Sequence, residues 1–377
     1  MKSAQNQSRK RSSDEGEIHW DEIMRGEIHL VEIDASGIRK TKNDYIGGKA
    51  AFCRLKWNAY KENPPSFPMF RFLVKESECD LRKKRVVLDD LPMIVKKMKE
   101  YDDSLKPSSP HDIRSMNPTG FVFHESRVGS TLVANSLTAM SAANRVFSES
   151  NPINTALKTD IPQLLRDVVY LMGRTNKAEE QNMFFKVSSI GSKHISVMRE
   201  AFPDTPWIFV YRDPVQTMMS HLDPKKVEMR NNGRIMAVCT RARNNPPKDL
   251  LDLVQRHGKR VDQLSDYQFC AAHLASLCDS ALHELKKPNN NGRAVEYDGL
   301  IDKLLDDVIP NHFGVTIGKD ARQRVLKVSK TYSKSKNQGV NWVEDSAKKE
   351  ARATPEIRSA SQLFLSKSYA ELKEYTV

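Results

Sequence analysis

Between residues 117 and 377 the hydrophobic positions follow two alternating patterns. Short apolar runs recur, and between them lie longer segments in which apolar positions return every three or four residues. The short runs predict strands at 121–124, 145–148, 183–187, 207–211 and 294–297. The longer segments predict helices at 130–142, 161–173, 192–201, 214–222, 265–286, 300–309, 321–330 and 355–375. Because this alternation is typical of a parallel sheet covered on both faces, we expect an α/β fold of three layers, α/β/α, with a central and mainly parallel sheet.

The first 116 residues have a different pattern. Residues 1–16 are polar and charged, which predicts a disordered tail. Residues 17–116 form an N-terminal accessory region that ends in a Pro/Ser-rich stretch. This region contains a predicted helix at 90–101 and two copies of Gly-Glu-Ile-His, with histidines at 19 and 29. The alternation around the second copy is typical of a half-buried strand, and we favour that interpretation over a metal site.

Composition narrows the possible partners without choosing among them. The 377 residues include 60 Lys and Arg and 48 Asp and Glu, and the net charge of +12 favours anionic partners. No run approaches about 18 apolar residues, and the polar N-terminus lacks the apolar core of a signal peptide, so we expect no membrane span. The five scattered cysteines contain no C-x-x-C pair, which predicts reduced thiols, no structural zinc and a cytoplasmic protein.

The segment from 121 to 140 has the character of an anion-binding strand–loop–helix. A turn that enters a helix offers unpaired backbone N–H groups and the positive end of the helix dipole. Gly129 lets an anion approach the backbone, Ser130 and Thr131 add hydroxyl donors, and Arg127 adds a positive charge. Nucleoside triphosphatases carry a lysine after the loop glycine, and here Ser130 occupies that position, which disfavours hydrolysis of ATP or GTP.

A second candidate site follows the predicted strand at 207–211. Arg212 ends this strand, Pro214 suits the first turn of the next helix, and Ser220 comes eight residues after Arg212. A guanidinium fork and a hydroxyl two helical turns apart can hold one phosphate group. The alternative is that Arg212 pairs with Asp213 or caps a neighbouring element, and that Ser220 lies on the surface.

Together these segments resemble the sulfotransferase family. "SRVGSTLVANSL" resembles the 5′-phosphosulfate loop of these enzymes, and "FVYRDPVQTMMSHL" resembles their 3′-phosphate motif, with its eight-residue Arg-to-Ser spacing. "MFFKVSS" resembles the central strand that carries a lysine, "AVEYDGLIDKLLDDVIPNHFGV" the Tyr-Glu-Asp-Leu segment, and "TYSKSKNQG" a basic C-terminal loop. The resemblance covers about residues 117–345 and implies the P-loop NTPase-like sulfotransferase fold, with 3′-phosphoadenosine 5′-phosphosulfate (PAPS) as donor.

The resemblance also implies which residues bind this donor. The 5′-phosphosulfate would lie against Arg127, Val128, Gly129, Ser130, Thr131 and Leu132. The 3′-phosphate would lie against Arg212 and Ser220, with Tyr297 near the adenine and Lys334 and Lys336 as further phosphate contacts.

In-line sulfuryl transfer builds negative charge on the leaving phosphate oxygen, and positioned cations stabilise that charge. Lys186, at the end of a predicted strand, and Arg127 suit this role. The alternative for Lys186 is a solvent-facing strand end.

A hydroxyl acceptor also requires a general base. In the cytosolic aryl and steroid sulfotransferases a histidine lies two residues after the matching lysine, whereas this chain has Ser188 there. We therefore predict a protein that is not of that type. Because other members of the superfamily use a glutamate, we predict Glu149 as the base, with His124 and His194 in reserve. The alternative for Glu149 is the cap of a helix that begins near Pro152.

Residues 224–265 form a basic insertion after the 3′-phosphate motif, with ten lysines and arginines. This insertion is either a mobile lid that favours acidic acceptors or a charged surface loop that is simply solvated.

Three functions remain open on the sequence alone. The first is a sulfotransferase that acts on a hydroxyl or amine of a small molecule or carbohydrate, without a metal ion. The second is a phosphotransferase or another nucleotide-binding protein with a degenerate P-loop. The third is a non-catalytic nucleotide- or RNA-binding protein on the same fold. The chain lacks the interleaved aromatic and basic motifs of a nucleic-acid reader, so we expect no specific nucleic-acid partner.

Overall fold

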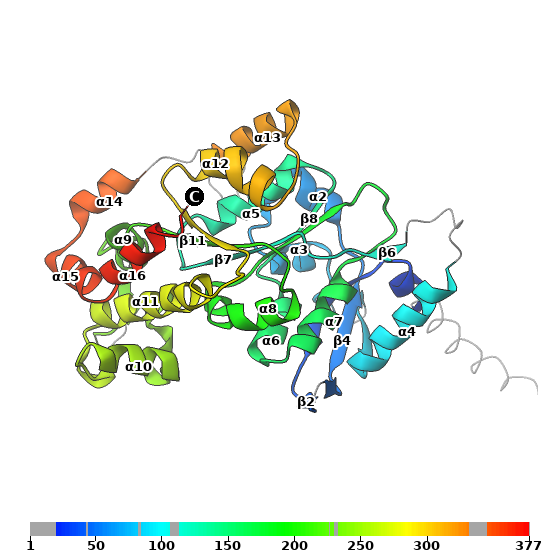
Figure 1. The fold of residues 1–377 in the computed structure, drawn as a ribbon, viewed down its shortest axis with the longest axis horizontal. Coiled ribbons are helices and arrows are strands. Elements are labelled where there is room, and N and C mark those ends of the chain that lie inside the picture. The colour runs from blue at the N-terminus through cyan, green and yellow to red at the C-terminus, as the bar shows by residue number, and fades with distance from the viewer. Residues whose placement is uncertain are drawn as a thin grey trace, which may run out of the picture.

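The structure is a computed structural model that describes residues 20–42, 44–81, 84–105, 113–225, 227–229, 233–331 and 345–376 (Figure 1). Its centre is a five-stranded parallel sheet in the order β14-β11-β7-β10-β8. These strands are β7 (Gly120–His124), β8 (Asn144–Ser148), β10 (Asn182–Lys186), β11 (Trp207–Tyr211) and β14 (Gly292–Glu296). Each was predicted from the sequence to within two residues at either end.

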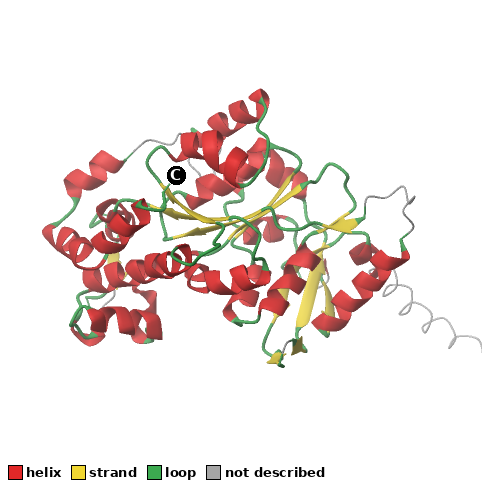
Figure 2. Ribbon diagram, in the orientation of Figure 1, coloured by secondary structure: helices red, strands yellow, loops and turns green. Residues whose placement is uncertain are grey.

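Helices cover both faces of this sheet, consistent with the predicted three layers (Figure 2). One face carries α5 (Ser130–Met140), α12 (Leu300–Lys303) and α13 (Lys319–Ser329), which lie above the sheet in Figure 1. The opposite face carries α6 (Asn151–Lys158), α7 (Pro162–Met172), α8 (Ile195–Ala201) and α11 (Asp266–Leu285). Because both faces are covered, every residue of β7, β8 and β11 is buried, as expected for a parallel sheet.

Stacked aromatic rings fill the core beside the central strands. Phe121, Phe185 and Phe147 come from three adjacent strands, with ring centroids 5.4 Å and 5.2 Å apart. Alternate residues of neighbouring strands point to the same face, so one phenylalanine from each strand builds a continuous stack. This packing fixes the strands whose ends carry the candidate site.

Three of the predicted helices differ from those observed. The segment predicted at 192–201 begins as a 3₁₀ helix, η3 (Ser189–His194), before α8. The segment at 300–309 continues from α12 into a π-helix, η6 (Leu304–His312), which contains Pro310. The single helix predicted at 355–375 is wrong, since the chain forms α15 (Pro355–Phe364) and α16 (Ser366–Lys373) on either side of Leu365. Periodicity alone did not reveal that break, because buried positions recur at helical spacing through both helices, from Ile357 to Leu372.

The accessory region folds around its own antiparallel sheet, in the order β1-β4-β5. The strands are β1 (His29–Asp34), β4 (Lys49–Cys53) and β5 (Val86–Asp89), and α4 (Leu91–Ser104) begins after the cap residue Asp90. The predicted helix at 90–101 is thereby confirmed, whereas β4 and β5 were missed. Its smaller elements are β2 (Arg39–Lys40), β3 (Tyr45–Ile46), α2 (Trp57–Glu62), η1 (Pro64–Ser66) and α3 (Phe70–Glu76). The predicted tail and His19 lie outside the described residues.

Buried polar contacts join the accessory region to the main sheet. Lys61 Nζ donates to Ala142 O at 2.7 Å and lies 3.1 Å from Glu180 Oε1, while Glu180 also pairs with buried Arg145. Arg145, in β8, also donates from Nη1 to the carbonyl of Arg174 at 2.7 Å. Arg174 belongs to β9 (Arg174–Thr175), which pairs with β6 (Arg114–Ser115). A buried carboxylate such as Glu180 needs cationic partners, and the accessory region supplies one of them, Lys61.

His29 begins β1 and packs edge-on against Trp57, with ring centroids 5.8 Å apart. Burial, and next the positive charge of Arg145, hold the pKa of His29 well below its usual value. No group of three or more His, Cys, Asp and Glu in the described residues could hold a metal ion. His29 is the first residue of β1, so the predicted strand is confirmed.

The prediction of reduced thiols was wrong. Cys53 pairs with Cys79 in a disulfide, Cys239 pairs with Cys270, and only Cys278 is a free, buried thiol. These partners lie 26 and 31 residues apart in the chain, and no local spacing rule connects residues at such separations.

The basic insertion is an ordered part of the fold in the residues that the structure describes. It contains β12 (Glu228–Met229), β13 (Ile235–Met236), η4 (Val238–Asn244), α10 (Lys248–Arg256) and η5 (Val261–Gln263), which the sequence analysis did not predict. The Cys239–Cys270 disulfide fastens η4 to α11, and α10 buries Leu250, Leu253 and Val254. These anchors argue against a loose, solvated excursion.

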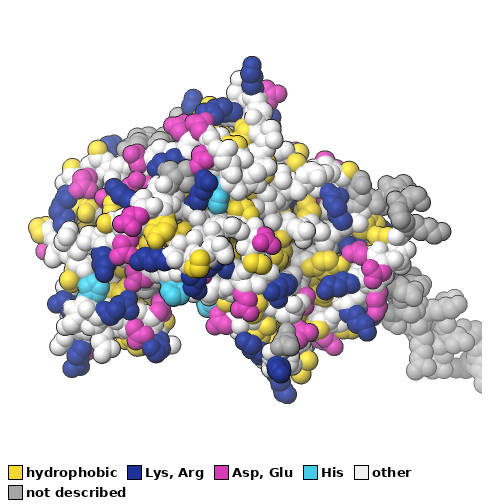
Figure 3. Space-filling model, in the orientation of Figure 1, with side chains coloured by type: hydrophobic (Ala, Val, Ile, Leu, Met, Phe, Trp, Pro, Cys, Tyr) yellow, Lys and Arg dark blue, Asp and Glu magenta, His cyan; other side chains and the backbone are white. Residues whose placement is uncertain are grey.

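The surface is mixed in charge, and no described helix is long and apolar enough to cross a bilayer. On the face shown in Figure 3, Lys and Arg side chains are interspersed with Asp and Glu. This face shows no continuous basic stripe of the kind that tracks a nucleic-acid backbone.

Candidate active site

The candidate residues follow the strands of one parallel sheet, so they meet at its carboxyl edge. Arg127 to Ser130 follow β7, Glu149 follows β8, Lys186 ends β10, Arg212 follows β11 and Tyr297 follows β14. From β7 the chain passes to β8 and β10 on one side and to β11 and β14 on the other. In open α/β sheets, ligands bind outside the carboxyl ends of the strands at such a switch point.

The loop between β7 and α5 has the geometry of an anion cradle. Arg127 and Gly129 have φ of 60° and 84°, and α5 begins directly after Gly129. Within the described residues, no backbone carbonyl accepts a hydrogen bond from the N–H groups of residues 127–131. Successive free N–H groups before a helix, in left-handed backbone, form a nest that suits an anion.

The side chains of this loop differ in how they are placed. Ser130 and Thr131 are each 4% exposed, Arg127 is exposed, and Leu132 is half-buried. Val128 is fully buried in the core, so only its backbone faces a ligand. The lysine found in nucleoside triphosphatases is absent here, and the full positive charge of the cradle comes from Arg127.

Gly129, Tyr297 and Arg212 stack on one another. A Cβ atom on Gly129 would lie 2.6 Å from Cδ2 and Cε2 of Tyr297, so the ring occupies the space that a side chain would fill. On Tyr297 lies the guanidinium of Arg212, whose Cζ is 4.0 Å from the ring centroid. The sheet thus brings the loop glycine and the predicted phosphate-binding arginine to one aromatic ring, a cation–π contact that orients the guanidinium.

The buried guanidinium of Arg212 donates hydrogen bonds to the side chains of Gln216 and Ser346. Its Nε donates to Gln216 Oε1 at 2.8 Å, and its Nη2 donates to Ser346 Oγ at 2.6 Å and lies 3.6 Å from Asp345 Oδ1. Ser220, on α9 (Pro214–Leu222), donates to the carbonyl of Gln216 at 2.8 Å. Gln216 thereby links the two residues that the sequence predicted as a pair.

Lys186 and Glu149 form an ion pair between adjacent strand ends. The Lys186 side chain is 1% exposed, which rules out the solvent-facing alternative, and the Glu149 side chain is 22% exposed. Glu149 has a φ of 51°, and its N–H donates to the carbonyl of Lys186 at 2.6 Å. The cap of α6 is Ser150, so the capping alternative for Glu149 is not what the structure shows. The strained backbone instead aims the carboxylate at the lysine.

The reserve histidines have structural partners. His124 is 4% exposed and its Nε2 lies 3.0 Å from the carbonyl of Val187. The Nδ1 of His194 lies 2.9 Å from Asp160 Oδ1. Ser188, at the position of the family's histidine, donates to Asn154 Oδ1 at 2.8 Å.

Sequence reasoning missed Gln216, Asp345, Ser346 and Glu125. Gln216 lies midway between Arg212 and Ser220, and the four-residue spacing on one helix face was a usable signal. Asp345 and Ser346 carried no signal, because they lie at the start of α14 (Ser346–Arg352), with Asp345 as its N-cap residue, beyond the segment that contains Lys334 and Lys336. That segment, residues 332–344, lies outside the described residues. Glu125, at the start of the cradle, is 1% exposed, and burial raises the pKa of its carboxyl well above the usual value.

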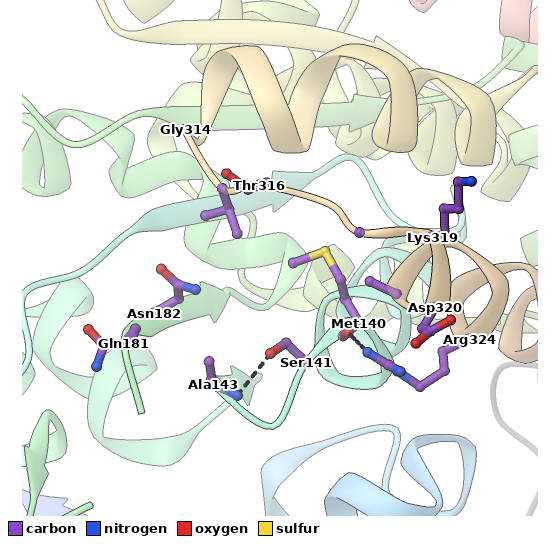
Figure 4. Close-up of a pocket in the computed structure, with 13 residues that line it drawn as sticks. Met140, Ser141, Ala143, Gln181, Asn182, Gly314, Thr316, Lys319, Asp320 and Arg324 are labelled. Carbon is purple, nitrogen blue, oxygen red and sulfur yellow. Dashed lines mark hydrogen bonds between the residues drawn. The ribbon is translucent and has the colours of Figure 1, made fainter. Parts of the chain in front are cut away.

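A cavity of about 580 Å³ lies elsewhere, at the amino edge of the sheet (Figure 4). Its lining includes Asn182 at the start of β10 and Arg324 of α13, whose Nη2 donates to Met140 O at 2.6 Å. A second cavity, of about 570 Å³, lies between α10, α11 and the C-terminal helices. Neither cavity contains a predicted site residue.

A scan against models of protein families finds no match, and a search of curated proteins finds no relative. One solved structure with some similarity is a sulfotransferase domain from the curacin biosynthetic pathway. It is 11% identical, with a TM-score of 0.33, and the alignment covers 66% of this chain and 98% of that chain. A likeness of this size does not by itself establish a shared function.

Proposed function

We propose that this protein is a sulfotransferase that transfers a sulfuryl group from PAPS to a hydroxyl or amine acceptor. The observation that carries the proposal is the stack of Gly129, Tyr297 and Arg212. In this stack, the loop of the anion cradle and a buried guanidinium both contact one aromatic ring. PAPS carries a phosphosulfate on the 5′ carbon and a separate phosphate on the 3′ carbon of one ribose, with an adenine on the 1′ carbon, so its chemistry matches two anion sites and an aromatic surface.

Each predicted residue has a role that its position supports. The N–H groups of 127–131 and the hydroxyls of Ser130 and Thr131 would hold the 5′ anion, and Arg127 would add charge from the exposed rim. Arg212 would hold the 3′-phosphate with the help of Ser220 and Gln216. We also propose that the fold is the P-loop-like sulfotransferase fold, because the loop leaves the strand at the switch point of the sheet.

The pairing of Lys186 with Glu149 supports a division of labour in the transfer step. The Glu149 carboxylate would take the proton from the acceptor, and the Lys186 ammonium would stabilise the charge that grows on the leaving phosphate oxygen. A proton on Glu149 removes its negative charge, so the lysine then becomes available to the leaving group. The acceptor class we propose is a small molecule or a carbohydrate, with no metal ion required.

The two disulfides bear on the compartment. Disulfides persist in oxidising compartments and are rare in the cytosol. They favour an oxidising compartment over the cytoplasm that the sequence predicted.

The decisive test of the donor is the binding of adenosine 3′,5′-bisphosphate, AMP and ATP to wild type and to Arg212→Ala. Wild type should bind the bisphosphate most tightly. Removing a buried, charge-assisted contact should weaken that binding by about 2–4 kcal/mol and leave the binding of AMP nearly unchanged. If wild type bound ATP more tightly than the bisphosphate, a phosphotransferase would be favoured. If Arg212→Ala weakened the binding of the bisphosphate and of AMP equally, the assignment of Arg212 to the 3′-phosphate would be wrong. Transfer from labelled PAPS to a panel of acceptors would then establish the activity.

A further inference from the structure

The guanidinium of Arg212 faces an anion supplied by the protein itself. Asp345 Oδ1 lies 3.6 Å from Arg212 Nη2, and the neighbouring Ser346 Oγ accepts a hydrogen bond from the same nitrogen at 2.6 Å. Arg212 is 5% exposed, while the Asp345 side chain is 44% exposed. A half-exposed carboxylate therefore reaches in from solvent to a buried cation that would otherwise attract a phosphate.

Two further ion pairs place this carboxylate. Arg352 of α14 pairs with Asp223, directly after α9, and this contact holds α14 beside α9 (Figure 1). Lys349 Nζ lies 2.8 Å from Asp345 Oδ1, closer than Arg212 does. Asp345 thus lies between two cations, and it keeps one of them if it leaves the other.

We propose that Asp345 is a built-in competitor for the 3′-phosphate subsite and sets how strongly the site selects that group. The inference rests on the proposed function. Two anions on one guanidinium repel each other, so a phosphate that binds Arg212 must displace the Asp345 carboxylate towards Lys349. The Ser346 hydroxyl, which now accepts from Arg212, can rotate and donate to the phosphate instead.

This exchange gives Asp345 and Ser346 opposite effects. The carboxylate opposes phosphate binding, because its contact with Arg212 must be broken first. The hydroxyl supports phosphate binding, because its hydrogen bond is kept with a new partner. Asp345 also gives the arginine an anionic partner when no phosphate is bound.

The test measures binding of adenosine 3′,5′-bisphosphate and AMP by calorimetry to wild type, Asp345→Asn, Ser346→Ala and the control Glu350→Gln. Glu350 is on the same helix and pairs with Arg358, so its substitution removes one negative charge without touching Arg212. We expect Asp345→Asn to bind the bisphosphate roughly tenfold more tightly, with AMP changed less than about twofold. Ser346→Ala should weaken the bisphosphate alone, and Glu350→Gln should leave the ratio of the two affinities as in wild type.

The possible failures are distinguishable. If wild type binds the two ligands equally, the proposed function fails, and the Asp345 inference fails with it. If wild type prefers the bisphosphate but Asp345→Asn keeps the wild-type ratio, only the Asp345 inference is overturned. An equal gain for both ligands, or the same gain in Glu350→Gln, would show a general effect of charge and would also overturn it.

Discussion

Gly129→Ala tests whether the cradle and Arg212 depend on each other through Tyr297. The substitution adds one methyl group at a backbone with φ of 84°. An L-residue in this left-handed region costs about 1–2 kcal/mol relative to glycine. The new carbon would also lie 2.6 Å from two ring atoms, whereas ordinary carbon contacts are about 3.5–4.0 Å, so the ring has to move by about 1 Å.

Moving the ring disturbs its contact with Arg212. A partly buried cation–π contact is worth about 1 kcal/mol, and part of it is lost when the ring shifts. The free energy of unfolding should therefore fall by about 1–3 kcal/mol in total. Gly314 provides a matched control, because it has a φ of 67° and a Cβ there would meet nothing within 4 Å. Gly314→Ala should show only the backbone cost of about 1–2 kcal/mol.

Urea denaturation gives the two stabilities, and calorimetry with adenosine 3′,5′-bisphosphate gives the binding. Gly129→Ala should weaken the bisphosphate about tenfold or more, whereas Gly314→Ala should not change it. Adding Tyr297→Ala to Gly129→Ala removes the clash, so the double variant should lose less stability than the sum of the two single variants. Equal losses in the two glycine variants, together with strict additivity in the double variant, would refute the reasoning.

Glu149→Gln should lower the turnover of labelled PAPS by about a hundredfold with little change in bisphosphate binding, and unchanged turnover would place the base elsewhere. Burial, and next the positive charge of Lys193, lower the pKa of His273 from an ordinary 6.5 to about 4, while the charge of Asp249 opposes this shift. As the pH falls, His273 is therefore protonated in the unfolded chain before it is protonated in the folded protein. The stability present above pH 6.5 should thus drop by about 2 kcal/mol between pH 7 and pH 5 in urea denaturation, a drop absent in His273→Gln. Replacing both Cys239 and Cys270 by serine should lower the free energy of unfolding by about 3–4 kcal/mol, since the bond closes a loop of 31 residues. Mass spectrometry of the unreduced, denatured wild-type chain should find one free thiol, Cys278, and five would contradict the pairing.

Much of the main sheet could be predicted because its signals are local. A buried strand shows as a short apolar run and a covering helix as an apolar stripe, and both are properties of a few neighbouring residues. The parallel arrangement follows from their alternation, and it places Glu149, Lys186, Arg212 and Tyr297 at one edge of the sheet. The accessory sheet was largely missed, since β5 is only four residues long and alternates between half-buried and exposed positions.

The sequence by itself determined which strand ends carry the candidate residues, because parallel strands bring their carboxyl ends to the same edge of the sheet. Only the tertiary structure decided which side chains touch there. Lys186 meets Glu149 across two strands, Tyr297 fills the space left by Gly129, and Ser346 reaches Arg212 across 134 residues of chain. The tertiary structure likewise decided which cysteines pair, because the partners are 26 and 31 residues apart in the chain. The physical reason is that periodicity is set by near neighbours in the chain, whereas a contact between distant residues is fixed by how whole elements pack in space.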